Sequence, residues 1–168
     1  DIEINKEKRT VRVPAGMKYG ELAVALHDRG WAIHNMASLP HISVAGAVAT
    51  ATHGSGVGNG NLATAVESLE IVLPDGSLKR ISKGDTNFEG YVVGLGLTGV
   101  VVNLDLAIEP TFNIAQTVYR GMSRESYAAN LYEIMSLAYS VSYFTTWAAA
   151  GGGEVWAKFK SGITAPTE

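Results

Sequence analysis

The sequence is 168 residues long, with 46% hydrophobic and 17% charged residues, a composition typical of a globular protein that holds one domain and part of another. A net charge of −3, with Lys and Arg scattered along the chain, argues against a nucleic-acid partner or an anionic membrane surface. The chain has no cysteine and no apolar run of the roughly 20 residues that cross a bilayer, so disulfides, thiolate metal sites and membrane spans are not expected.

Local sequence patterns predict two hairpins and a helix in the first 81 residues. Two pairs of short β-branched runs indicate antiparallel hairpins: residues 1–5 with 10–13, and residues 68–73 with 77–81. The second pair flanks Pro74-Asp75-Gly76, whose residue types favour a tight turn. Between the hairpins, apolar residues recur at helical spacing over residues 18–29, and Gly30 follows where a left-handed cap ends a helix.

A strand is predicted at residues 100–108 and is followed by Pro110, after which a new series of predicted strands and a helix begins. We therefore expect a first domain at residues 1–110 and the start of a second at residues 111–168. The second domain is predicted to hold a strand, a helix and two strands, at residues 112–119, 123–139, 141–148 and 154–160. The helix has Ser123 as its N-cap and one apolar face made of Tyr127, Leu131, Ile134, Met135 and Ala138. Gly151-Gly152-Gly153 is a turn or a flexible excursion between the last two strands, and the predicted fold class is α+β.

Small residues dominate positions 43–58 and leave backbone N–H groups open to a ligand that approaches closely. Residues 45–52 are expected to form one or two helical turns whose N-terminus faces a phosphate or pyrophosphate. Close packing of a Gly-Ala helix against a sheet explains the same composition equally well. Composition alone leaves both interpretations open.

Other motifs in the sequence argue against particular kinds of site. Residues 94–99 read Gly-Leu-Gly-Leu-Thr-Gly, but they lead into a strand instead of following one, so we interpret them as a tight helix-to-strand turn and not as an NAD site. The four histidines lack the spacing of a zinc site. His53 is the histidine most suited to touch a ligand, although it equally suits a role in pinning its own loop. No residue stands out as a catalytic nucleophile, acid or base.

At these residues the chain resembles a known family. Residues 34–62 and 94–100 are similar to the second half of the PCMH-type FAD-binding domain in the vanillyl-alcohol oxidase superfamily. Residues 35–46 resemble the group of bacterial alditol and xylitol oxidases, which are related to aldonolactone oxidases such as D-arabinono-1,4-lactone oxidase. The resemblance continues through residues 138–142 and 155–156. It implies the second lobe of the FAD domain, a mixed or antiparallel sheet with flanking helices, followed by the start of an α+β substrate domain.

The resemblance also implies roles for particular residues. It places Ser38 near the isoalloxazine, in contact with both cofactor and polyol. The FAD pyrophosphate and ribityl region is assigned to Ser43, Gly46, Thr50, Thr52 and His53. The backbone of Val100 would meet the adenine side. The implied reaction oxidises the CH–OH group of an alditol or sugar lactone, with O₂ as acceptor and H₂O₂ as product.

The same family pattern indicates what the 168 residues do not include. They lack the loop whose histidine attaches FAD covalently, and the residues that activate the polyol are expected after Glu168, so no catalytic residue is assigned. The chain has no initiator Met and no signal peptide, and we expect it to be an inactive, cytoplasmic piece of a longer protein that self-associates through an uncovered apolar surface. The alternatives are an NADPH-dependent flavoenzyme like UDP-acetylmuramate reductase and a non-catalytic interaction module.

Overall fold

The computed structural model describes residues 1–147 and 152–161. These form two compact units, one made of residues 1–54 and 60–111 and the other of residues 55–59 and 112–161. Each unit has its own antiparallel sheet and its own buried apolar cluster, which gives the predicted α+β fold. Within the described residues, no helix has the length and apolar character needed to cross a membrane.

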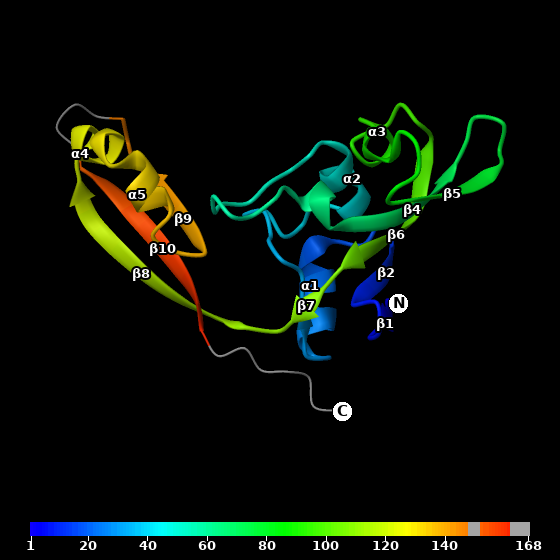
Figure 1. The fold of residues 1–168 in the computed structure, drawn as a ribbon, viewed down its shortest axis with the longest axis horizontal. Helices are drawn as coiled ribbons and strands as arrows, with labels where there is room; N and C mark the ends of the chain where they lie inside the picture. The colour runs from blue at the N-terminus through cyan, green and yellow to red at the C-terminus, as the bar shows by residue number, and fades with distance from the viewer. Residues whose placement is uncertain (148–151, 162–168) are drawn as a thin grey trace. The chain divides into compact units, whose positions relative to one another are not determined.

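A five-stranded sheet forms the first unit, with the order β1-β2-β6-β4-β5 and every neighbouring pair antiparallel (Figure 1). The strands are β1 (Glu3–Asn5), β2 (Thr10–Pro14), β4 (Val66–Val72), β5 (Leu78–Ser82) and β6 (Val100–Ala107). The two predicted hairpins are confirmed as β1–β2 and β4–β5. Strand β6 lies between them, so that Leu104 pairs with Val13 on one side and with Leu69 on the other.

Short helices complete the first unit. They are α1 (Tyr19–His27), α2 (Val44–Ala49), the 3₁₀ helix η1 (Leu62–Ala65) and α3 (Phe88–Val92). The predicted helix is confirmed as α1, and Gly30 after it has the left-handed φ of 77° that its sequence position suggested. The chain then forms β3 (Trp31–Ala32), which pairs with β7 (Glu109–Pro110). The glycines at 94–99 connect α3 to β6, as predicted.

One face of the sheet is buried because its apolar residues alternate with polar ones. Fully buried residues of the strands are Val11, Val13, Ile71, Ile81, Leu104 and Leu106. The same cluster contains Leu22 and Leu26 of α1 and Val44 and Val48 of α2. The two helices and the sheet therefore share a single core, which fixes where α2 lies.

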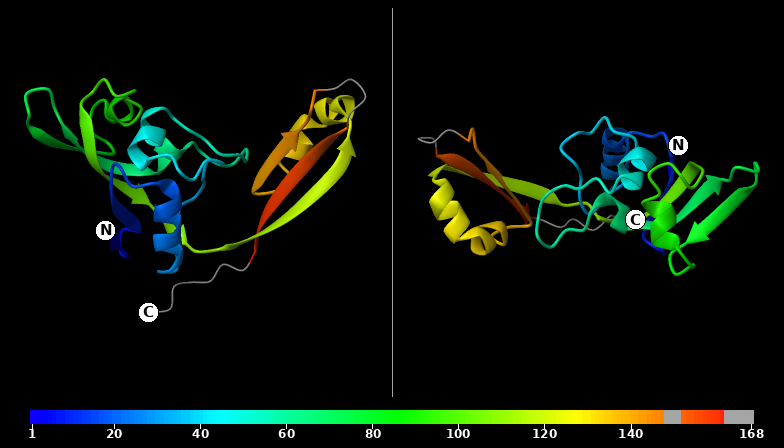
Figure 2. Two further views of the ribbon diagram at one scale, coloured as in Figure 1. Left: turned by 180° about the vertical axis from the view of Figure 1, so that it is seen from behind. Right: turned by 90° about the horizontal axis from the view of Figure 1, so that it is seen from above.

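The second unit is a three-stranded antiparallel sheet in the order β8-β10-β9, with two short helices (Figures 1 and 2). Its elements are β8 (Asn113–Met122), α4 (Arg124–Ala129), α5 (Leu131–Met135), β9 (Ser140–Phe144) and β10 (Gly153–Ser161). The three predicted strands are present as β8, β9 and β10, but the strand predicted at residues 141–148 ends at Phe144, since residues 145–147 are described and are not part of a strand. Ala148 and Gly151, which the predictions also covered, lie outside the described residues.

The prediction of one continuous helix at residues 123–139 is wrong. Asn130 has φ −120° and ψ 26°, so the chain forms α4 and α5 in place of a single helix. Asparagine competes for backbone hydrogen bonds, and here its side-chain Nδ2 donates to the Ser126 carbonyl at 2.9 Å. The break also leaves Leu131 48% exposed instead of on the apolar face. The predicted cap is confirmed, since Ser123 Oγ accepts from the Ser126 N–H at 3.0 Å.

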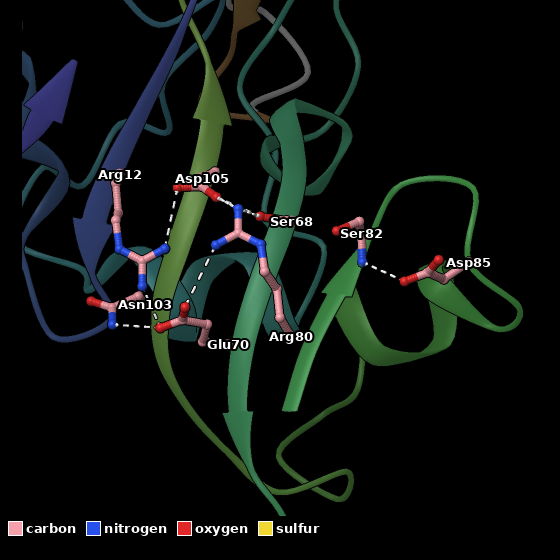
Figure 3. Close-up of polar contacts among 8 residues, drawn as sticks. All are labelled: Arg12, Ser68, Glu70, Arg80, Ser82, Asp85, Asn103 and Asp105. Atoms are coloured by element: carbon pink, nitrogen blue, oxygen red, sulfur yellow. Dashed lines mark hydrogen bonds and ion pairs between the residues drawn. The ribbon is translucent and has the colours of Figure 1, made fainter. Parts of the chain in front are cut away.

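The other face of the five-stranded sheet carries an ion-pair network across four strands (Figure 3). Arg12 of β2 pairs with Glu70 of β4, and its Nη1 lies 3.7 Å from Asp105 Oδ1 of β6. Arg80 of β5 pairs with the same two carboxylates and lies 3.5 Å from Glu70 Oε1. The hydrogen bond from Arg12, with another from Asn103, holds the pKa of Glu70 below its usual range.

We predict that Glu70→Gln lowers the free energy of unfolding by about 2 kcal/mol at neutral pH, since charge-assisted hydrogen bonds of a side chain only 19% exposed are lost. The pKa of Glu70 is lower in the folded state than in the unfolded state. The contribution of ionised Glu70 to the free energy of unfolding is therefore complete above the unfolded-state pKa of about 4.3, and it is lost as the pH falls through the folded-state pKa. Urea unfolding from pH 3 to 7 measures both effects.

Glu67→Gln is the matched control for this substitution. Glu67 lies on the same strand, and within the described part of the chain its side chain pairs only with Lys83, at 2.8 Å. We expect its loss to change stability by well under about 1 kcal/mol. Two results would contradict a structural role for the network. One is an equal loss of unfolding free energy in the two variants, and the other is a fall in stability toward pH 3 that Glu70→Gln leaves unchanged.

Candidate functional site

Five of the seven residues assigned to the cofactor follow one another along α2 and the segment after it. Ser43 is the N-cap of α2, and its side chain makes no capping hydrogen bond. Gly46 lies within the helix, Thr50 ends it, and Thr52 and His53 come next. The expected helical turn at residues 45–52 is present, although it ends at Ala49.

The two sides of α2 differ in burial. Val44, Ala47 and Val48 are buried in the core, whereas Gly46 and Thr50 are exposed. A Cβ built at Gly46 meets only Ser43 Oγ, at 2.7 Å, and a serine hydroxyl can rotate away. Packing against the sheet therefore does not require glycine at this position. The exposed side of the helix has no bulky side chain at Gly46, so a ligand can approach the backbone there.

Hydrogen bonds hold the end of this helix in place. Thr50 Oγ1 donates to the Gly46 carbonyl at 3.1 Å and lies 3.1 Å from Thr52 Oγ1. His53 Nδ1 lies 2.8 Å from the Gly54 carbonyl, which can only accept. A neutral His53 bonded in this way has an acceptor at Nε2, and only the charged ring has a second N–H to donate. His53 thus pins its own loop while its exposed ring can still meet a ligand.

The loop that carries Ser38 runs beside this segment. A Cβ on Gly54 would lie 2.3 Å from the Met36 carbonyl oxygen and 2.5 Å from Asn35 Oδ1, so residues 35–36 pack directly against Gly54. Asn35 Oδ1 also accepts the Met36 N–H at 2.9 Å. Sequence alone predicts no individual role for Asn35, because nothing local in it shows that Asn35 meets Gly54. Ser38 itself is exposed two residues further along.

The glycine turn that precedes Val100 contacts α2 from a distant part of the sequence. The Leu95 N–H donates to the Ala49 carbonyl at 3.1 Å. Exposed apolar side chains follow on this turn, with Leu95 65%, Leu97 86% and Val100 67% exposed. Among the described residues, no hydrogen bond joins Ser38 or Val100 to the α2 group. The predicted self-association through an apolar surface stays a prediction.

The arrangement suits an extended ligand with phosphate groups better than a metal ion. Ser43, Thr50 and Thr52 supply hydroxyl groups around an exposed glycine, the residue types that accept close approach by a phosphate. Residues 1–147 and 152–161 contain no group of three or more His, Cys, Asp or Glu side chains placed to hold a metal ion. The donor set therefore fits the pyrophosphate of a dinucleotide cofactor.

Sequence comparisons agree with this chemistry. Residues 1–82 match the FAD binding domain family. An alditol oxidase from a Streptomyces strain is 47% identical over 163 residues, which covers 94% of this chain and 38% of the relative. An L-gulonolactone oxidase from Mus musculus is 29% identical over 126 residues, covering 74% of this chain and 29% of the relative. The chain thus spans well under half the length of either enzyme.

A solved structure shows the same fold. Cholesterol oxidase from Brevibacterium sterolicum superposes with a TM-score of 0.83 over 99% of this chain and 35% of that protein, at 17% identity. At this identity the likeness concerns the fold alone. Both units of the chain take part, since nearly all of its residues are covered.

We predict that Gly46→Leu weakens FAD binding by about tenfold or more while leaving stability intact. The new side chain points into open space next to Ser43, and leucine is a better helix former than glycine by roughly 0.5–1 kcal/mol. Flavin loading of the apoprotein and thermal unfolding measure the two effects separately.

The control is Gly90→Leu in α3. Gly90 is also an exposed helical glycine, with nothing within 4 Å of a built Cβ. We expect this variant to bind FAD normally. A loss of stability in Gly46→Leu with unchanged flavin loading would show that the glycine serves packing and not a ligand.

Proposed function

Because a relative that is 47% identical covers 94% of the chain and residues 1–82 match the FAD binding domain, this chain belongs to the FAD-linked oxidase family, and we propose that the full-length protein is an FAD-dependent oxidoreductase acting on polyols. It oxidises the CH–OH group of an alditol or a related sugar lactone. The substrate loses two electrons and two protons overall, and O₂ takes them up as H₂O₂. FAD supplies the two-electron chemistry, and the protein binds and orients the reactants.

The observation that carries this proposal is the extent of the match to alditol oxidase. The 47% identity runs over 163 residues and so includes both structural units. The L-gulonolactone oxidase covers a smaller share of the chain at lower identity, which favours an alditol over a lactone as the substrate. The first unit would then be part of the FAD domain and the second the beginning of the substrate domain.

The proposal gives each assigned residue a role. Ser43, Gly46, Thr50 and Thr52 form the face that receives the pyrophosphate and ribityl groups, using the hydroxyls around α2. His53 contributes through the ring edge that does not face Gly54. The backbone of Val100 is assigned to the adenine side by the family resemblance alone.

Ser38 has a different task from the phosphate-binding residues. The residue is exposed and lies on the loop that packs against Gly54, and the family resemblance assigns its hydroxyl to the flavin and the polyol. The covalent flavin link implied by the family resemblance would use a histidine outside these 168 residues. The side chains that activate the polyol also belong to the rest of the full-length protein. The 168 residues alone are therefore expected to bind FAD weakly and to be inactive.

We predict that the full-length protein, loaded with FAD, consumes O₂ and releases an equal amount of H₂O₂ when given xylitol or sorbitol. The isolated 168 residues, assayed in parallel, should give no peroxide. An oxygen electrode and a coupled peroxidase assay measure the two quantities.

Three outcomes would contradict this proposal or part of it. Reduction of the flavin by NADPH, with no reaction toward polyols or lactones, would favour a reductase. Failure of the full-length protein to retain any flavin would favour a non-catalytic module. Peroxide production by the 168 residues alone would show instead that they contain the complete catalytic machinery.

A further inference from the structure

The turn between α3 and β6 holds a leucine in a backbone conformation that suits other residue types. The Leu97 N–H donates to the Gly94 carbonyl at 2.8 Å. Between these two residues, Leu95 and Gly96 have positive φ values of 51° and 76°. The hydrogen bond and the two φ values are those of a type I′ turn, whose first central position favours asparagine, aspartate or glycine. Leu95 occupies that position, so its side chain strains the backbone.

Burial of the leucine side chain does not offset this strain. Leu95, Leu97 and Val100 are all more than half exposed. An apolar side chain stabilises a fold through the area that it removes from water, and these three remove little. Residues 94, 96 and 99 are glycines, so glycine is common in this segment but does not occupy the strained position. The packing of Leu95 therefore does not explain why leucine stands there.

Both ends of the turn are held in place within the first unit. The Leu95 N–H donates to the carbonyl of Ala49, the last residue of α2, at 3.1 Å. Gly99 has φ 133°, and a Cβ there would lie 2.5 Å from the Val72 carbonyl oxygen of β4, so only glycine lets the two backbones approach this closely. The Leu95 side chain thus starts from a fixed point at the end of α2, where Thr50 follows.

A second non-glycine residue has a left-handed backbone at the same helix end. Ala51 has φ 52°, and its N–H donates to the Val48 carbonyl at 3.0 Å. The Thr52 N–H donates to the Ala47 carbonyl at 2.9 Å. These two hydrogen bonds form the Schellman motif, in which the left-handed residue is usually glycine. Ala51 and Leu95 therefore place two strained backbone positions at one end of α2, and such strain is typical of ligand-binding sites.

The chemistry of Leu95 and Leu97 selects one part of FAD. Aliphatic side chains have no donor or charge for a phosphate group, whereas they remove area from water when they pack against a flat ring. FAD has two ring systems. The loop of Ser38, which is assigned to the isoalloxazine, packs against Gly54. The glycine turn leads directly into Val100, whose backbone is assigned to the adenine side.

We propose that the side chains of Leu95 and Leu97 form an apolar wall that contacts the adenine ring of FAD, and that this contact is the reason for leucine at the strained position 95. The inference rests on the proposed function. Because the turn is fixed by its bond to Ala49 and by the approach of Gly99 to Val72, the wall is in place before the cofactor arrives. Little ordering is then left for adenine binding to do.

The test compares Leu95→Asn with Val24→Asn in the full-length protein. Asparagine tolerates a left-handed backbone, so Leu95→Asn removes the apolar side chain and preserves the turn. Val24 of α1 is the matched control, since it is an apolar residue of the first unit that is 63% exposed, against 65% for Leu95. The readouts are the FAD concentration that half-saturates the apoprotein, the melting temperature of the apoprotein, and nuclear Overhauser effects between leucine methyl protons and the ring protons of bound FAD.

We expect Leu95→Asn to raise the half-saturating FAD concentration about fivefold. Its melting temperature should equal or exceed that of the unsubstituted protein, because asparagine relieves the backbone strain. Val24→Asn should leave FAD binding unchanged. In the unsubstituted protein, the methyl signals that Leu95→Asn removes should show Overhauser effects to the ring protons of adenine.

Three results would overturn this inference alone. The first is equal FAD binding by Leu95→Asn and Val24→Asn. The second is an Overhauser effect from the Leu95 methyl groups to isoalloxazine protons in place of adenine protons. The third is a lower melting temperature of Leu95→Asn with normal FAD binding, which would show that another part of the protein covers this leucine. Absence of FAD binding by the unsubstituted protein would overturn the proposed function and this inference together.

Discussion

The buried apolar face of the five-stranded sheet is the constraint on which the candidate site depends. Leu104 and Leu106 of β6 lie at its centre, each 1% exposed, and Val44 and Val48 of α2 pack into the same cluster. Burial of one such side chain stabilises the fold by roughly 1.5–3 kcal/mol, so α2 cannot turn or shift without losing several of these contributions. The helix is too short to be stable by itself, and its position follows from the core beneath it.

Because one side of α2 is fixed by the core, its other side is free to serve a ligand. That side has no large side chain, and a built Cβ at Gly46 meets only a serine hydroxyl. The glycine turn ahead of β6 reaches the end of the same helix through the Leu95 to Ala49 hydrogen bond. Two segments far apart in sequence thus border one small-residue face, and the sheet order β2-β6-β4 is what brings them there.

Most local elements could be predicted from the sequence, because turn residues and apolar periodicity act over short distances. Pro74-Asp75-Gly76 fixed its hairpin, and Gly30 ended its helix with a φ of 77°. The helix predicted at residues 123–139 is split at Asn130. The prediction missed this break because it followed apolar periodicity, which does not show that the asparagine side chain bonds to the backbone. Contacts across long separations gave no sequence signal. The pairing of β6 with β2 and β4, the packing of Asn35 on Gly54 and the attachment of residues 55–59 to the second unit all depend on the tertiary fold.

The central claim is that α2 and the residues after it form the protein's FAD-binding face. Hydrogen exchange of the full-length protein, measured with and without FAD, tests this claim most directly. The account predicts slower exchange on FAD addition for backbone amides in residues 43–54 and 94–100, with no change in residues 113–122 of β8. Unchanged exchange in residues 43–54 of a protein that has demonstrably bound FAD would contradict it.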